Sequence, residues 1–229
     1  MTAKDKSPHY AGHRARLRER FLEGGADALQ DYELLELVLS FAHPRGDVKP
    51  LAKELIQRFG GFSAAISADS RALKEIKGVG ETTIAALRVV RAAAVRLARE
   101  DASERTVLSS WDRVLAYCRT ALAHEPTERV HILFLDTKNV LIRAEAQGRG
   151  TIDHTPVYPR EVVKRALELG AAAMILVHNH PSGDPTPSKA DIEMTRQIVA
   201  AAKPLGIEIH DHLIIAKRGH ASFKSLGLL

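Results

Sequence analysis

The sequence predicts an all-helical domain followed by an α/β domain in which helices pack on a mixed sheet. In roughly the first hundred residues, apolar side chains recur at three- and four-residue spacing between breaks rich in Gly, which is typical of amphipathic helices. After the polar segment 101–105, short apolar runs of strand length alternate with helical patterns. We therefore expect two domains, 1–104 and 105–229, with 101–105 as the linker.

The individual elements follow from these patterns and breaks. In the first domain we expect helices at 11–23, 31–41, 48–59, 62–67, 70–76 and 81–100. In the second domain we expect helices at 111–123, 159–169 and 188–203, and strands at 130–136, 140–147, 172–177 and 207–216. A turn at 137–139 joins the first two strands, and Gly170 ends the helix before the third.

The composition is that of a globular protein with a modest basic excess. Hydrophobic residues make up 45% of the 229 residues, enough for a real core, and the formal net charge is +5. No apolar run reaches the length of a membrane span, and the polar N-terminus lacks the apolar region of a secretory signal. The single cysteine, Cys118, excludes an internal disulfide and lies in an apolar helical pattern. We expect a cytoplasmic protein with Cys118 in its core.

The segment 178–191 is the most informative part of the chain. It follows an apolar run, so His178 and His180 stand at i and i+2 on an extended strand end and point to the same face. A turn of Pro, Gly and Asp follows, and a new helix begins at Ser188 with Asp191 in its first turn.

Two imidazoles and one carboxylate can converge at this place. Three N/O ligands with a fourth position left to water make a catalytic zinc site. Ser188 and Asp191 also form a Ser-x-x-Asp pattern, which is typical of a helix capping box. The two interpretations are compatible, because a cap would hold the helix that carries the ligand.

The motif resembles that of a known family. His-x-His, seven residues, Ser, two residues and Asp is the JAMM (MPN+) metalloprotease signature, and the chain is similar to its RadC-like branch at 150–153, 159–161, 178–183 and 211–215. The resemblance implies an MPN fold and a zinc-dependent peptidase or isopeptidase acting on an unknown peptide or protein. It implies one zinc ion per chain, bound by His178, His180 and Asp191.

Hydrolysis also needs a general base, and local spacing leaves Glu125, Glu128, Glu145 and Glu161 open. The resemblance selects Glu128, just before the strand at 130. It also implies that the hydroxyl of Ser188, left free while the backbone caps the helix, donates to the developing oxyanion.

A second His-x-His, at 210–212, lies inside a strand pattern without a following carboxylate-bearing helix. The resemblance makes Asp211 and His212 supporting residues around the zinc site and not ligands.

The first domain resembles a helix-hairpin-helix DNA-binding motif at Gly78, Val79 and Gly80, between two predicted helices. Glycines let the backbone approach a phosphate, and the next helix start directs free N–H groups at it. Arg14 and Arg18 share one face of the first helix and would add phosphate contacts. We expect weak, sequence-independent DNA binding by this domain. The alternative is a tight interhelical turn beside a solvated arginine face. The segment 59–62 is a candidate companion hairpin.

Other functions remain open or are excluded by absent motifs. The sequence has no His-Glu-x-x-His, no Walker A motif and no Cys-x-x-Cys, which argues against a thermolysin-like site, ATP binding and a zinc finger. A DNA-repair-associated protein whose metal domain is a scaffold is one alternative. A metal-dependent nuclease is another.

Overall fold

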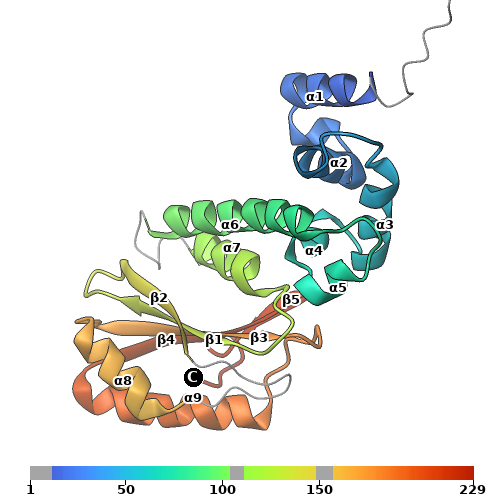
Figure 1. Cartoon of the computed structure of the whole chain (residues 1–229). Coiled ribbons are helices and arrows are strands. Elements are labelled where there is room, and N and C mark those ends of the chain that lie inside the picture. Colours follow the sequence, from blue (N-terminus) through green and yellow to red (C-terminus); the bar gives the residue numbers. More distant parts are fainter. Residues whose placement is uncertain (1–11, 104–110, 148–156) are drawn as a thin grey trace, which may run out of the picture. The chain divides into compact units, whose positions relative to one another are not determined.

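The computed structural model describes residues 12–103, 111–147 and 157–229, and it divides the chain into two compact units, Met1–Ala93 and Ala94–Leu229 (Figure 1). The first unit is helical and the second is built on a five-stranded sheet. The predicted fold class, an α/β domain preceded by helices, is confirmed.

The first unit consists of helices bounded by recognisable local signals. Its elements are α1 (His13–Gly24), η1 (Ala26–Ala28), α2 (Asp31–Ala42), α3 (Lys49–Phe59), α4 (Phe62–Ser67), α5 (Ser70–Lys74) and the start of α6 (Glu81–Ser103). Gln30 and Glu33 form a capping box at the start of α2. Gly60, with φ +90°, ends α3 in the left-handed conformation that glycine adopts without strain. Leu35, Leu55 and Leu73 are fully buried in the core of this unit.

Helix α6 continues into the segment where a linker was expected. Residues 101–103 continue the helix, whereas 104 and 105, and with them the predicted domain boundary, lie outside the described residues. Polarity alone did not break the helix, because this part of the segment contains neither Gly nor Pro. The division between the two units falls within α6. Val95 and Ala98, from its second half, pack against the core of the second unit.

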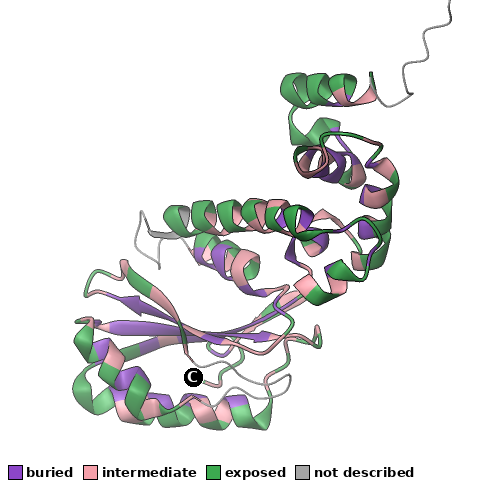
Figure 2. Ribbon diagram, viewed as in Figure 1, coloured by how far each residue is buried: buried purple, intermediate pink, exposed green. Residues whose placement is uncertain are grey.

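The second unit contains a mixed sheet with the strand order β2-β1-β3-β4-β5. Its elements are α7 (Trp111–Leu122), β1 (Val130–Leu135), β2 (Leu141–Gln147), α8 (Pro159–Glu168), β3 (Ala173–His180), α9 (Lys189–Ala202), η3 (Lys203–Leu205), β4 (Glu208–Ala216) and β5 (Gly219–Ser222). β3 and β4 are parallel and joined through α9, and the other neighbours are antiparallel. Figure 2 shows the central strands β1 and β3 buried along almost their whole length.

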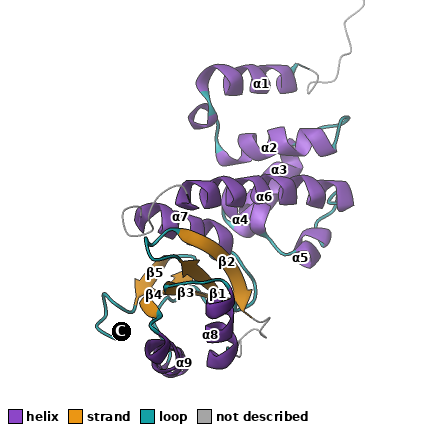
Figure 3. Ribbon diagram, turned by 90° about the vertical axis from the view of Figure 1, so that its left-hand side faces the viewer, coloured by secondary structure: helices purple, strands orange, loops and turns teal. Residues whose placement is uncertain are grey.

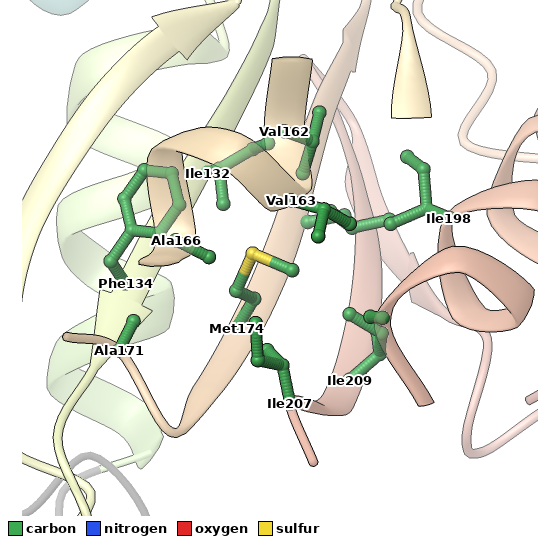
Figure 4. Close-up of a cluster of buried hydrophobic side chains, with 12 residues drawn as sticks. Ile132, Phe134, Val162, Val163, Ala166, Ala171, Met174, Ile198, Ile207 and Ile209 are labelled. Carbon is green, nitrogen blue, oxygen red and sulfur yellow. The ribbon is translucent and has the colours of Figure 1, made fainter. Parts of the chain in front are cut away.

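Helices cover both faces of this sheet (Figure 3). Helix α7 packs on one face through Val114, Cys118 and Leu122. Helices α8 and α9 pack on the other, where Met174 and Ile198 lie in the apolar cluster of Figure 4. Cys118 is buried as predicted, and burial raises the pKa of its thiol to about 12.

The structure also differs from the sequence prediction at β5 and at the end of α5. Strand β5 was not predicted, because Gly219–Ser222 has no apolar run. It forms a strand by pairing with the neighbouring β4. Helix α5 ends at Lys74, earlier than predicted, where the chain turns towards Gly78. Within the described parts of the chain, no helix combines the length and apolar character needed to cross a membrane.

Candidate metal centre

The C-terminal end of β3 carries the two histidines of the predicted site. Leu176 packs in the cluster formed with α8 and α9, whereas Val177 packs on the α7 face. By the same strand alternation, His178 and His180 follow Leu176 on the α8/α9 side. His178 is buried and His180 is partly buried. An almost fully buried strand thus brings two imidazoles to one side of the sheet.

The turn after β3 orients the second imidazole. His180 Nδ1 lies 2.8 Å from the carbonyl oxygen of Asp184. A carbonyl can only accept, so this contact places the proton on Nδ1 and leaves Nε2 as a lone-pair donor. The side chain of Asp184 in turn accepts hydrogen bonds from the backbone N–H and hydroxyl of Thr186. Gly183, with φ +92°, supplies the left-handed residue that the turn requires.

Helix α9 begins at this turn and carries the carboxylate. Ser188 is its N-cap, and it forms a reciprocal capping box with Asp191. The hydroxyl of Ser188 accepts from the Asp191 backbone N–H at 3.1 Å and donates to Asp191 Oδ2 at 2.6 Å. The expectation that this hydroxyl is free while the backbone caps the helix was therefore wrong. The side chain of Ser188 itself caps the helix, and its hydroxyl proton is donated to the Asp191 carboxylate.

The imidazoles and two carboxylates converge around His178. Asp191 Oδ1 lies 3.0 Å from His178 Nδ1, and Asp191 Oδ2 lies 3.4 Å from His180 Nε2. Glu128 Oε1 lies 3.5 Å from His178 Nε2. Glu128, His178 and His180 form a group whose donor atoms all lie within 4.8 Å of one another, so these three residues could hold a metal ion. Asp191 is outside that group, although its oxygens contact both rings.

The donor set fits a metal ion. Both ring nitrogens of His178 are buried, and neither makes a hydrogen bond with good geometry to the described residues. Buried polar atoms without partners are rare and call for a specific explanation. Imidazole nitrogens and carboxylate oxygens are the donors that zinc accepts in catalytic sites. A cation would bind one nitrogen of His178, leave the other as an N–H donor to a carboxylate, and offset the negative charge of the two acids.

The electrostatics of the pocket favour an ionised carboxylate. Burial alone would raise the pKa of Asp191, but its interactions with His178, His180 and Ser188 outweigh burial and hold this pKa far below its ordinary value. The hydrogen-bonding interaction with Asp191 raises the pKa of His180. Asp191 is therefore negatively charged at neutral pH, as a metal ligand must be.

The structure places the four candidate general bases in different surroundings. Glu128 brings its carboxylate to His178. Glu125 is buried and pairs with Arg129, at 3.1 Å. Glu145 lies on β2 and is paired with α8, and Glu161 lies in the first turn of α8 beside an arginine.

The two expected supporting residues take different positions. His212 is fully buried, and its ring stacks at 6.2 Å on that of His178. His212 Nδ1 lies 2.7 Å from the hydroxyl of Thr195, which itself donates to the Asp191 carbonyl. Burial lowers the pKa of His212 to about 3, so this ring is neutral. His212 thus lies beside the ring of His178.

Asp211 points away from this pocket. Its carboxylate accepts hydrogen bonds from the His212 backbone N–H, the Ser222 hydroxyl and the Lys224 backbone N–H. These contacts tie β5 and the following turn to β4. Asp211 therefore supports the strand that carries His212, and its influence on the histidines is indirect.

A polar residue that the sequence reasoning did not single out lies between the two histidines. Asn179 is buried, on the sheet face opposite to His178 and His180. Its side-chain oxygen accepts from the Arg129 backbone N–H at 2.8 Å. The available signal was a polar residue in a strand that is otherwise buried on both faces.

In the first unit, the predicted hairpin lies between α5 and α6. Gly78 has φ +93°, Val79 is buried in the helical core, and Gly80 is exposed. A buried Val79 holds the turn while the flanking glycine backbone faces solvent. This is the arrangement that a backbone contact to phosphate requires, and it equally suits a plain interhelical turn.

The two arginines predicted to accompany the hairpin have different surroundings in the structure. The guanidinium of Arg14 donates to the carbonyl oxygens of Pro44 and Gly46, at 3.0 and 2.5 Å, so it holds α1 to the loop before α3. Arg18 is exposed on α1. At the candidate companion hairpin, Asp31 Oδ2 accepts from the backbone N–H of Phe62 at 2.9 Å. An acidic side chain already occupies this helix start and would repel phosphate.

Comparison with known proteins agrees with the fold. Residues 108–228 match the family described as RadC-like JAB domain, and residues 11–85 match the one described as UPF0758 N-terminal. A relative from Rhodobacter capsulatus, named UPF0758 protein, is 61% identical over 213 residues, which cover 93% of this chain and 100% of the relative. The histidines of β3 and the start of α9 lie within the first of these matches, and the chain belongs to the family of RadC-like JAB-domain proteins.

Proposed function

We propose that this protein is a zinc-dependent hydrolase of the peptidase or isopeptidase type. The observation that carries the proposal is the convergence of two histidines and two carboxylates around His178, whose buried ring nitrogens lie near these carboxylates but make no well-aligned hydrogen bond to the described residues. A scaffold would have no need for this arrangement, because buried ring nitrogens without hydrogen-bond partners destabilise a fold.

In this proposal His178, His180 and Asp191 hold the zinc ion, one per chain. Asp191 is preferred to Glu128 as the third ligand because it is more buried and is fixed by the capping box of α9. Bound zinc would polarise a substrate carbonyl and make a water molecule acidic enough to ionise near neutral pH.

The remaining polar groups supply proton transfer and oxyanion stabilisation. Glu128, at 3.5 Å from His178, would take a proton from the attacking water and pass it to the leaving nitrogen. Ser188 would donate a hydrogen bond to the developing oxyanion. For this its hydroxyl must turn from Asp191 Oδ2, to which it now donates.

A cleavage screen tests the reaction class. Zinc-loaded wild-type protein and the Glu128→Gln variant are incubated with a proteome-derived peptide library and, separately, with duplex and single-stranded DNA. We expect peptide or isopeptide bonds to be cut by the wild type alone. Cleavage of DNA alone would favour a nuclease, and no cleavage of either substrate would favour the scaffold alternative.

Replacing Ser188 with alanine is expected to lower both stability and rate. Loss of the N-cap costs about 1 kcal/mol, which would appear as a lower thermal midpoint. Loss of one oxyanion donor lowers kcat by roughly a hundred- to a thousand-fold in a formed site. Thermal denaturation and steady-state kinetics measure the two effects separately.

Ser182→Ala is the matched control for this prediction. Ser182 lies in the same turn and is exposed, and among the described residues its hydroxyl makes only a long contact, of 3.4 Å, to the Asp184 backbone N–H. Its replacement should leave stability and rate close to those of the wild type. A Ser188→Ala protein with normal kcat but reduced stability would show that Ser188 acts as the N-cap of α9 and not in catalysis.

We further propose that the first unit attaches the protein to DNA weakly and without sequence preference. The support is the exposed glycine backbone around the buried Val79, together with the exposed Arg18. Arg14 is not counted as a contact, since its guanidinium is already bonded to backbone carbonyls. Such contacts position a protein on the phosphate backbone without reading bases.

Gly80→Ala tests the hairpin contact in the full-length protein. A methyl group at Gly80 meets no atom within 4 Å, so folding should be unaffected while the approach of a phosphate is obstructed. We expect weaker duplex binding at low salt and an unchanged thermal midpoint. Arg18→Ala should reduce the slope of log affinity against log salt by about one.

Gly219→Ala, in β5, is the control, because a methyl group there also meets open space. Equal binding by the wild type, Gly80→Ala and Arg18→Ala, or binding insensitive to salt, would remove DNA attachment from the proposal.

A further inference from the structure

The side chain of Asn179 spans the segment that carries Glu128. Its Nδ2 donates to the carbonyl oxygens of Thr127 and Glu125, at 3.0 and 3.4 Å. Its Oδ1 accepts from the Arg129 backbone N–H at 2.8 Å, and the Arg129 carbonyl accepts from the Asn179 backbone N–H at 3.2 Å. The Asn179 side chain thus binds the chain before Glu128 through its amide N–H groups and the chain after Glu128 through its amide oxygen.

We call these hydrogen bonds of Asn179 the clamp. They matter because the segment 125–129, which carries Glu128, has no regular secondary structure of its own. Residues 125–129 lie between the end of α7 and the start of β1. Strand alternation directs His178 and His180 to one face of β3 and Asn179 to the other. One tripeptide of β3 thus carries both histidines and the anchor of the carboxylate that faces them.

We propose that Asn179 is a positioning residue that holds Glu128 at its distance from the two histidines. The inference rests on the proposed metal centre, and it adds a residue that acts on this centre through the segment that carries Glu128. Asn is suited to this role because the clamp needs one acceptor and two donors on a short side chain. Asp would keep the acceptor and lose both donors, and Leu would lose all three.

A titration with Co²⁺ alone, followed by visible absorption, tests this without a substrate. Asn179→Leu should weaken Co²⁺ binding by no more than Glu128→Gln does, because it displaces the Glu128 carboxylate from the histidines and leaves the three ligands in place. In a Glu128→Gln background the same substitution should change the affinity by less than about twofold, because its effect acts through the carboxylate. Asn179→Asp should fall between the wild type and Asn179→Leu.

Val177→Ala is the matched control. It removes buried atoms from the same face of β3, two residues earlier, and its side chain cannot hydrogen-bond to the segment. It should lower stability while leaving Co²⁺ affinity unchanged. An equal loss of affinity for Asn179→Leu in both backgrounds, or no loss in either, would overturn the proposal.

If the variants do not fold, backbone hydrogen exchange of the wild-type protein still tests the clamp. The Arg129 backbone N–H lies in an irregular segment but is bonded to a buried side chain, so it should exchange slowly. Fast exchange at Arg129 would contradict the clamp. Failure of the metal centre itself is distinguished by His178→Ala: unchanged Co²⁺ binding in that variant would reject the centre, whatever Asn179 does.

Discussion

Replacing Glu128 with glutamine is expected to abolish hydrolysis while leaving the fold and one zinc ion per chain in place. The amide has the size of the carboxylate but cannot accept the proton of the attacking water. General-base catalysis contributes on the order of a hundred- to ten-thousand-fold in rate. His178, His180 and Asp191 remain, so zinc should still bind at micromolar protein concentration, with lower affinity because one nearby negative charge is lost. Initial rates on a peptide identified by the cleavage screen, with elemental analysis of the same sample, measure both effects.

Glu125→Gln is the matched control. Glu125 is buried on the same segment, but its carboxylate pairs with Arg129, at 3.1 Å. This change should leave the rate within about threefold, because the amide can still accept a hydrogen bond from Arg129 and the pair lies outside the reacting groups. Full activity in Glu128→Gln would reject Glu128 as the base. Loss of zinc in that variant would instead make Glu128 a ligand, as its place within 4.8 Å of both histidines allows.

Removing one histidine is expected to have the largest effect on the molecule as a whole. His178→Ala should lose the stoichiometric zinc and all hydrolysis, because the ring lies between both carboxylates. A ligand that binds only the native state stabilises it by about 4 kcal/mol when its free concentration is a thousand times its dissociation constant. The thermal midpoint of the zinc-loaded wild type should therefore fall on chelation, and that of His178→Ala should not respond. Metal analysis and thermal denaturation with and without a chelator measure these outcomes.

His210→Ala is the control for this prediction, because it disrupts the second His-x-His. His210 is bonded to Asn139 and lies near Glu208, away from the β3 histidines in sequence and contacts. It should keep zinc and its response to chelation. Stoichiometric zinc in the double variant His178→Ala/Asp191→Ala would place the metal elsewhere and refute this centre.

The local features of the site were predictable from the sequence because they depend on neighbours along the chain. Strand periodicity places His178 and His180 on one face whatever the strand pairs with. The Ser188–Asp191 capping box is a property of four consecutive residues at a helix start. The alternation of apolar runs also predicted most helices and strands. The same reasoning could not reveal β5, whose four residues are held by pairing with β4 and not by a pattern of their own.

The choice of partners was decided by tertiary structure. Glu128 and Glu125 lie three positions apart, and only the fold directs one to His178 and the other to Arg129. Asn179 reaches its carbonyl partners across more than fifty positions, a pairing that no local spacing encodes.

Local sequence likewise could not show that some polar groups are already in use. Arg14 carries the same charge and helical spacing as Arg18, yet its guanidinium is bonded to the carbonyls of a loop thirty positions away. The hydroxyl of Ser188 is already in use, because it accepts from the Asp191 backbone N–H and donates to the Asp191 carboxylate. Periodicity along the chain sets the direction of a side chain, and long-range packing sets which donors and acceptors remain available to a ligand.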